Sequence, residues 1–172
     1  TGANGFEHGG GGGTIVLAHP GNDQAGNTLI TSSGVLSVPD VSNAGVPGPL
    51  GTGSAFKFTV NNTTFRFTGA NGSTDRDFYQ NAAGSQDVTV EHVGSGTLAF
   101  SGSFLSGNNY GHAFIFNVVD PAGVIENSGV IQNGGTAGLW LYKRGAGTQL
   151  LSAANTHTGN TVVDEGTLGF TA

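Results

Sequence analysis

The chain has 172 residues, of which 32 are Gly and 11 are Phe, and its formal net charge at pH 7 is −6. This length is enough for one domain with a buried core, and the Phe content argues against the disorder that is typical of highly charged, apolar-poor chains. Five Lys and Arg residues without a basic cluster are not expected to bind nucleic acid. The lack of Cys excludes disulfides, and no apolar run approaches the roughly 18 residues of a membrane-spanning helix.

The predicted elements are short strands, beginning after a Gly-rich segment at 1–13 that is expected to be a flexible arm. Clusters of Gly, Asn or Ser interrupt the apolar runs every 8–12 residues or so, which indicates an all-β fold. No segment has a helical pattern. We expect strands at 14–18, 28–31, 35–38, 55–60, 64–68, 88–93, 97–101, 113–118, 138–142, 148–151, 161–163 and 167–170.

In the clearest of these strands, apolar and polar residues alternate, which is typical of half-buried strands. The predicted core residues are Phe56, Phe58, Phe65, Phe67, Leu98, Phe100, Phe114, Phe116, Leu150 and Leu168. His92 alternates with Val88 and Val90 and is expected to be an ordinary inward or edge residue of its strand.

Internal repetition favours a stacked architecture over a β-sandwich. Residues 12–38 and 145–170 share one pattern of Gly-Thr, apolar run, Asn corner and Gly-Asn-Thr, and 94–102 is a weaker copy. Such repeats bury their apolar faces by stacking. Two similar six-residue units, 123–128 and 129–134, fit two sides of one coil that each end in an Asn corner, where Asn side chains could form ladders. We therefore predict a single parallel β-helix, or β-solenoid, over 1–172, with a β-sandwich as the alternative.

Two connecting segments are ambiguous in the sequence. Residues 60–63 fit either a hairpin loop, which would place Lys57 opposite Arg66, or a solenoid corner, which is slightly favoured. The Pro- and Gly-rich segment 39–54 cannot form ladders well. It is predicted to be a loop that protrudes from the coil or a seam between two blocks.

Possible catalytic or metal-binding groups are sparse. Asp75, Asp77 and Asp87 are the acidic residues that a polysaccharide-cleaving enzyme could use, but 71–77 is read as a solvated loop with an internal ion pair. Calcium binding there is the less favoured alternative, since Arg76 would repel the ion. The five His residues lack the local spacing of a zinc site. We expect no catalytic residue, no metal site and no cofactor.

Aromatic residues give a stronger signal for binding. Trp140 and Tyr142 alternate with two Leu residues, so that buried leucines would leave both rings exposed as a stripe. Tyr110 and the pair Phe78–Tyr79 could extend this stripe, which could stack on sugar rings. The slightly favoured interpretation is that Trp140 is simply covered by a loop such as 103–112.

The C-terminal copy resembles a known family. The segments Lys143-Arg144-Gly145-Ala146-Gly147-Thr148, then 150–161 (LLSAANTHTGNT), then Glu165-Gly166-Thr167-Leu168 are similar to the autotransporter-associated β-strand repeat of bacterial surface proteins. The resemblance implies a right-handed parallel β-helix with an extracellular location and transfers no catalytic residue. The chain starts at Thr1 and shows no Met and no signal peptide, as expected of a processed or excised exported segment.

These features predict a structural module that associates head-to-tail with itself through open coil ends, because unpaired strand edges invite pairing. A carbohydrate-binding adhesin and a polysaccharide-cleaving enzyme are the alternatives. The residues expected at the self-association surface are Phe6, Thr14, Ile15, Leu17, Val162, Val163, Leu168 and Phe170.

Overall fold

The structure is a computed structural model, and it describes residues 6–9, 11–60, 62–81, 86–107 and 110–171. In these ranges every regular element is a β-strand, and the strands form three parallel sheets. The seven-stranded sheet has the order β17 (Thr161–Val163), β15 (Leu139–Arg144), β12 (His112–Val118), β9 (Gln86–His92), β6 (Thr63–Phe67), β4 (Gly34–Val38) and β2 (Thr14–Val16).

The two other sheets contain the remaining described strands. The five-stranded sheet has the order β18 (Thr167–Phe170), β16 (Thr148–Leu151), β13 (Val124–Asn127), β10 (Thr97–Phe100) and β7 (Gly72–Thr74). The six-stranded sheet has the order β1 (Glu7–His8), β3 (Thr28–Ile30), β5 (Ala55–Phe58), β8 (Asp77–Gln80), β11 (Phe104–Ser106) and β14 (Ile131–Gln132).

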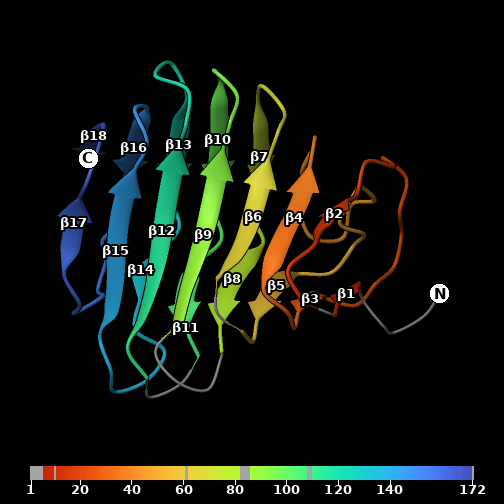
Figure 1. Cartoon of the computed structure of the whole chain (residues 1–172), viewed down its shortest axis with the longest axis horizontal. Coiled ribbons are helices and arrows are strands. Elements are labelled where there is room, and N and C mark those ends of the chain that lie inside the picture. Colours follow the sequence, from red (N-terminus) through yellow and green to blue (C-terminus); the bar gives the residue numbers. More distant parts are fainter. Residues whose placement is uncertain (1–5, 10, 61, 82–85, 108–109, 172) are drawn as a thin grey trace.

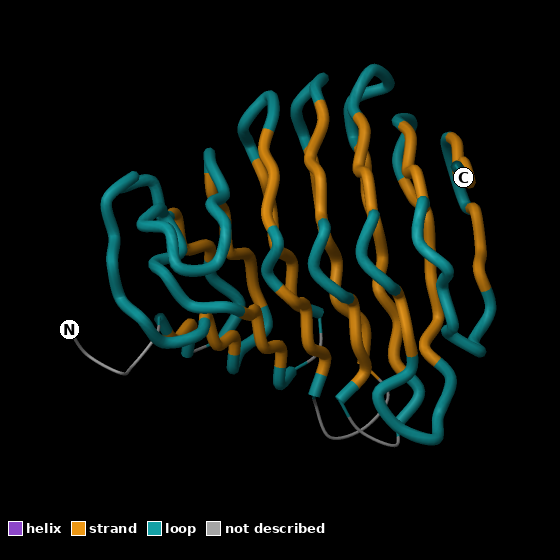
Figure 2. The backbone as a smooth tube through the Cα atoms, turned by 180° about the vertical axis from the view of Figure 1, so that it is seen from behind, coloured by secondary structure: helices purple, strands orange, loops and turns teal. Residues whose placement is uncertain are grey.

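From β6 to β16 the chain passes through the seven-, five- and six-stranded sheets in turn, so each circuit forms one coil of a parallel β-solenoid. Before β7 no described strand belongs to the five-stranded sheet, and between β16 and β17 none belongs to the six-stranded sheet. Coils are stacked along the long axis, with the N-terminal coils at one end and the C-terminal coils at the other (Figures 1 and 2). Residues about one coil apart become neighbours: Arg66 of β6 and Glu91 of β9, 25 residues apart, are bonded to each other. The parallel β-helix is confirmed, and the β-sandwich alternative is wrong.

The two six-residue units of the sequence form two sides of one coil, as predicted. β13 lies in the five-stranded sheet and β14 in the six-stranded sheet. β5 and β6 belong to different sheets, so they do not form a hairpin, and Asn62 has a left-handed φ of 53° that fits a corner. Asn61 lies outside the described residues. Lys57 is consequently beside Tyr79, and Arg66 is beside Glu91.

The core runs through the centre of the coils. Eight of the predicted core residues are completely buried, namely Phe56, Phe58, Phe65, Phe67, Leu98, Phe100, Phe114 and Phe116. Phe78 joins them: its ring stacks on that of Phe104, with centroids 4.6 Å apart. Its predicted place in the surface stripe is therefore wrong.

The prediction for Leu150 is also wrong. In β16 the buried side chains are Gln149 and Leu151, while Leu150 lies on the outer side and is only half-buried. Leu168 is paired in register with Gln149 and packs against the core, but it is half-buried because no described coil covers it. His92 is fully buried and faces inward, and its Nε2 lies 2.9 Å from the Gly96 carbonyl oxygen.

Corner Asn side chains such as Asn27 and Asn71 bind the backbone of the next coil, and no two Asn side chains of the described residues are hydrogen-bonded to each other as a ladder would require. The Asn27 Oδ1 accepts from the amides of Ser54 and Ala55, each at 3.0 Å, and the Asn71 Oδ1 accepts from Thr97 at 2.9 Å. Each such bond satisfies an amide at a point where strand pairing stops.

Residues 39–54 contain no strand, yet this segment is anchored. Leu50 is fully buried, and the Gly48 and Thr52 amides donate to the carbonyls of Asn22 and Gln24. The segment 71–77, read from the sequence as a solvated loop, instead contains β7 and the fully buried Arg76. That interpretation is wrong, because the Arg76 guanidinium lies inside the coil and binds the carbonyls of 39–54.

The Arg76 guanidinium takes the place of a strand ladder for this segment. Its Nε donates to the Ser42 carbonyl at 2.9 Å, and its Nη2 donates to the carbonyls of Asn43 at 3.2 Å and Gly51 at 2.6 Å. Its Nη1 donates to the Gly53 carbonyl. Burial lowers the pKa of Arg76, and the neighbouring Asp75 carboxylate opposes that effect.

The described residues contain no helix with the length and apolar character needed to cross a bilayer.

Candidate functional site

Trp140 and Tyr142 project from the outer face of the seven-stranded sheet. Leu139 and Leu141 are fully buried, so the alternation of β15 directs the two aromatic rings outward. The ring centroids are 6.2 Å apart and the planes differ by 14°. Trp140 is 38% exposed, so the expected covering by 103–112 does not occur in the described residues. The outward stripe is confirmed for these two residues.

A shallow pocket lies beside these rings. It has a volume of about 290 Å³ and is lined by Asp87, Gly111, His112, Ala113, Trp140 and Tyr142. In register, Trp140 is paired with Ala113 and Tyr142 with Ile115 of β12. Ala113 is 4% exposed and Ile115 is 6% exposed, although both face outward. The large rings thus shelter the smaller side chains of the neighbouring coil and form one wall of the pocket.

The other two aromatic residues of the predicted stripe lie elsewhere. Tyr110 is 49% exposed and precedes β12, near the end of the sheet where Trp140 lies, but it does not line the pocket. Tyr79 lies on β8 of the six-stranded sheet, in a second pocket of about 380 Å³ that also contains Lys57 and Asn81. The structure does not place Tyr79 with Trp140.

Two of the three acidic residues considered for catalysis bind the backbone of neighbouring coils. The Asp75 Oδ1 accepts from the Ala44 amide at 2.7 Å, and the Asp77 Oδ1 accepts from the Ser103 amide at 2.8 Å. Asp87 is on a different sheet and lines the aromatic pocket. In the described ranges no three His, Asp or Glu side chains are grouped as metal ligands would be. The three Asp residues therefore do not form one site.

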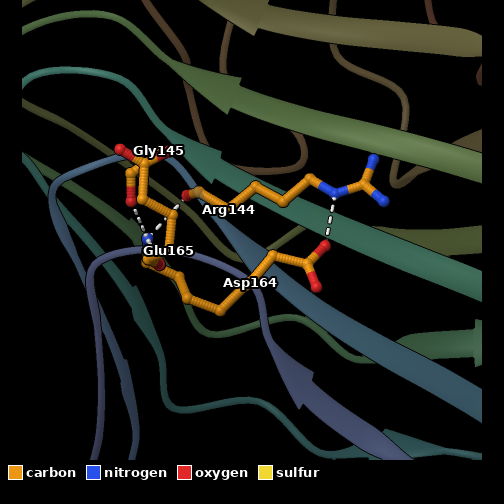
Figure 3. A network of polar contacts seen from close by, with 5 residues as sticks. Arg144, Gly145, Asp164 and Glu165 are labelled. Atoms are coloured by element: carbon orange, nitrogen blue, oxygen red, sulfur yellow. Dashed lines mark hydrogen bonds and ion pairs between the residues drawn. The ribbon is translucent and has the colours of Figure 1, made fainter.

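A polar network closes the corner after β15 (Figure 3). Lys143 is fully buried, and its Nζ donates to the carbonyls of Arg144 and Gly145, both at 2.6 Å, and of Glu165 at 3.2 Å. Arg144 lies outside, where its Nε donates to Asp164 at 2.9 Å. Burial lowers the pKa of Lys143, and the Glu165 carboxylate opposes that effect.

The C-terminal coil leaves inward-facing apolar side chains uncovered. Val163 is paired in register with the buried Lys143, and Phe170 with the buried Leu151, so both point toward the coil interior. Even so, Val163 is 49% exposed and Phe170 is 74% exposed. Val162, by contrast, lies on the outer face beside Tyr142. This end of the solenoid therefore presents an apolar cross-section.

The N-terminal coil is more closed. Phe6, Ile15 and Leu17 are half-buried and pack against the chain's own core, while Thr14 is exposed on β2. The Phe6 carbonyl accepts from the Leu29 amide at 2.7 Å, as the start of the β1–β3 pairing. At both ends, the edge strands β2 and β17 of the seven-stranded sheet have one side without a described partner.

Parallel strands stacked in three sheets, with corners held by polar side chains, define a repeat-built β-solenoid. In comparison with known proteins, residues 141–169 match the passenger-associated-transport-repeat model, so this part of the chain is similar to a repeat of this kind. The chain is also 32% identical over 156 residues to the adhesin BmaC autotransporter of Brucella suis biovar 1 (strain 1330), covering 89% of this chain but 4% of that relative. No solved structure matches.

The match and the fold together confirm the resemblance to autotransporter passenger repeats. The similarity indicates an extracellular or cell-surface location and supports an adhesin-like structural module. The chain spans a small part of the relative, and the family region spans the last coils of this chain.

Proposed function

We propose that the chain is a non-enzymatic structural module of an extracellular surface protein and that it associates head-to-tail with itself through its coil ends. The observation that carries this proposal is the uncovered interior of the last coil, where Val163 and Phe170 face inward yet are 49% and 74% exposed. An apolar surface of this kind is stabilised when another coil covers it.

Backbone geometry supports the same contact. The Asp164 amide donates to the Lys143 carbonyl, and amides alternate in direction along a strand, so the Val163 amide points to the free side of β17. On β2, the Leu17 amide donates to Ser37, and the Val35 amide donates to Gly13, which leaves the amides and carbonyls of Thr14 and Val16 on the free side. Pairing β17 of one copy with β2 of the next continues the seven-stranded sheet by strand addition.

The hydrogen bonds that the carboxylates already make support the non-enzymatic part of the proposal. Asp75 and Asp77 each accept a backbone amide of a neighbouring coil. A general acid or base needs a carboxyl group that can reach a substrate, and these two groups stabilise corners instead.

Light scattering and electron microscopy of the purified 172-residue chain test the association. We expect a mass that rises with protein concentration and linear particles, with little dependence on salt, because Asp164 is already paired with Arg144. Phe170→Asp and Val163→Pro are expected to give folded monomers. Val46→Asp is the matched control, since Val46 is 50% exposed and lies in the 39–54 segment, outside the edge strands β2 and β17.

A monomeric wild-type chain at high concentration contradicts the association, and so does a Phe170→Asp variant that assembles as the wild type does. Deleting residues 1–13 is a less clean test, because it also removes β1 and Phe6 from the chain's own core.

A further inference from the structure

The pocket beside Trp140 contains a carboxylate with no described partner. The Asp75, Asp77 and Glu91 side chains each accept at least one hydrogen bond. Asp87 is exposed, and none of the described residues donates to its carboxylate. A carboxylate is an acceptor for hydroxyl and other donors, so Asp87 adds a polar contact to an otherwise aromatic wall.

Trp140 and Tyr142 are stacked with their ring centroids 6.2 Å apart, and one end of this stack is already occupied. The two ring planes differ by only 14°. The Arg144 guanidinium carbon lies 5.5 Å from the centre of the Tyr142 ring, and the Arg144 Nε is bonded to Asp164. Because Arg144 already makes the cation–π contact with Tyr142, a second cation there would be repelled. An anionic ligand would in turn be repelled by Asp87.

A neutral ring with one apolar face and hydroxyl groups at its rim fits these constraints. Aromatic side chains bind such a face by their large apolar area. A hydroxyl hydrogen bond to a carboxylate is stronger than a bond between neutral groups. The volume of about 290 Å³ is at the lower limit of ligand sites, which suits one ring of a longer molecule that extends into solvent.

We propose that this pocket binds a neutral hexopyranose unit of a glycan, with the sugar ring against Trp140, its edge beside Tyr142, and its hydroxyl groups donating to Asp87. Trp140 and Tyr142 lie on the outer face of the solenoid and not at a coil end. Glycan binding is therefore compatible with head-to-tail association and does not depend on it.

Trp140 is the only tryptophan of the chain, so its fluorescence reports on this pocket alone. The probes are three neutral oligosaccharides (cellohexaose, maltohexaose and chitohexaose), an acidic one (hexagalacturonate) and tetramethylammonium chloride. We expect a saturable change of Trp140 emission with at least one neutral oligosaccharide, and none with the acidic sugar or the ammonium ion. Light scattering of the same samples reports assembly separately, so that either proposal can fail alone.

Calorimetry with the best neutral probe tests the residues. Trp140→Ala and Asp87→Asn are each expected to weaken binding by about tenfold or more. Tyr79→Ala is the control, since Tyr79 lies on another sheet and should leave the affinity unchanged. Circular dichroism checks that each variant keeps its β-structure.

Three outcomes overturn the inference. They are no saturable binding of any neutral probe, equal affinity of Trp140→Ala and the wild type, and a response to tetramethylammonium in place of sugar.

Discussion

Lys143 and Glu165 meet across two successive coils, where the Lys143 Nζ donates to the Glu165 carbonyl at 3.2 Å although the residues are 22 apart in sequence. The same ammonium group also binds the carbonyls of Arg144 and Gly145. The buried ammonium of Lys143 thus connects the corner after β15 to the corner between β17 and β18 in the last coil. This contact is a side-chain substitute for strand pairing at a place where the backbone turns.

Lys143→Met is expected to destabilise the chain. Burying a carbonyl without a partner costs about 1–3 kcal/mol, and three carbonyls lose the same donor. The loss should concentrate in β17 and β18, which follow this corner. Hydrogen exchange of residues 161–170 together with urea unfolding measures the effect, and Lys57→Met, at an exposed position, is the control. Unchanged exchange in the last coil contradicts the assigned role.

The Lys143 pKa also gives a pH dependence. Burial lowers the pKa of Lys143 in the folded state below its ordinary value of 10.5. Between these two pKa values the unfolded state binds more protons, so the free energy of unfolding rises with pH. Below the folded pKa the cost of the buried charge is constant. Denaturant unfolding should show the wild type gaining stability relative to Lys143→Met as the pH approaches 10.5, and a falling difference contradicts the direction.

Arg76 should matter more than any other cation for residues 39–54. Its guanidinium donates to four different carbonyls of this segment. Arg76→Met is expected to cost at least about 2 kcal/mol, because several buried acceptors lose their donor. Arg76→Lys should recover part of the stability, since a single ammonium cannot reproduce the planar fork.

Limited proteolysis tests the local part of this prediction. In Arg76→Met, cleavage should appear first within 39–54, ahead of global unfolding measured by urea. Cleavage that begins elsewhere, or a stability equal to that of the wild type, argues against Arg76 as the anchor of the segment.

The comparison of Leu150 and Leu151 shows how far the sequence determines the core. The run Thr148–Leu151 ends in two leucines, so its alternation is compatible with either one facing inward. The previous coil decides which of the two leucines faces inward. Asn127 of that coil is paired in register with Leu151, and the Asn127 Oδ1 accepts from the Gln149 side chain at 3.2 Å. Strictly alternating runs such as that of Phe56 and Phe58 were predictable, because only one phase buries the rings.

Other features depended on neighbours that a single sequence does not reveal. The stripe of Trp140 and Tyr142 followed from local alternation, whereas its partner Asp87 is brought close only by the register of β9 with β12. The sequence indicates a solvated Arg76 because the acceptors of its guanidinium are backbone carbonyls 23 to 34 residues away. Every residue has a backbone carbonyl, so such acceptors leave no pattern in the sequence.

Truncating Leu150 and Leu151 to Ala, one at a time, should distinguish the buried position from the outer one by the loss of stability. Leu151→Ala is expected to cost about 2–5 kcal/mol, as for a large-to-small change in a core, since Leu151 is 2% exposed. Leu150→Ala removes the same atoms from a half-buried outer position and should cost about 1 kcal/mol or less. Urea unfolding of both variants gives the ranking, and equal costs contradict the assigned phase of β16.

Gly159 is expected to tolerate no side chain, because it lies where the last coil passes close to β15. A Cβ added there would lie 2.4 Å from the Leu139 carbonyl oxygen and 2.6 Å from the Trp140 Cδ1. Gly159→Ala must therefore move the backbone or the indole, at a cost of about 1–3 kcal/mol for an overpacked site. Gly13→Ala is the matched control, since a Cβ at Gly13 meets nothing within 4 Å. Urea unfolding and Trp140 fluorescence measure both effects, and a Gly159→Ala variant with the wild-type stability and emission spectrum contradicts the close approach of these two coils.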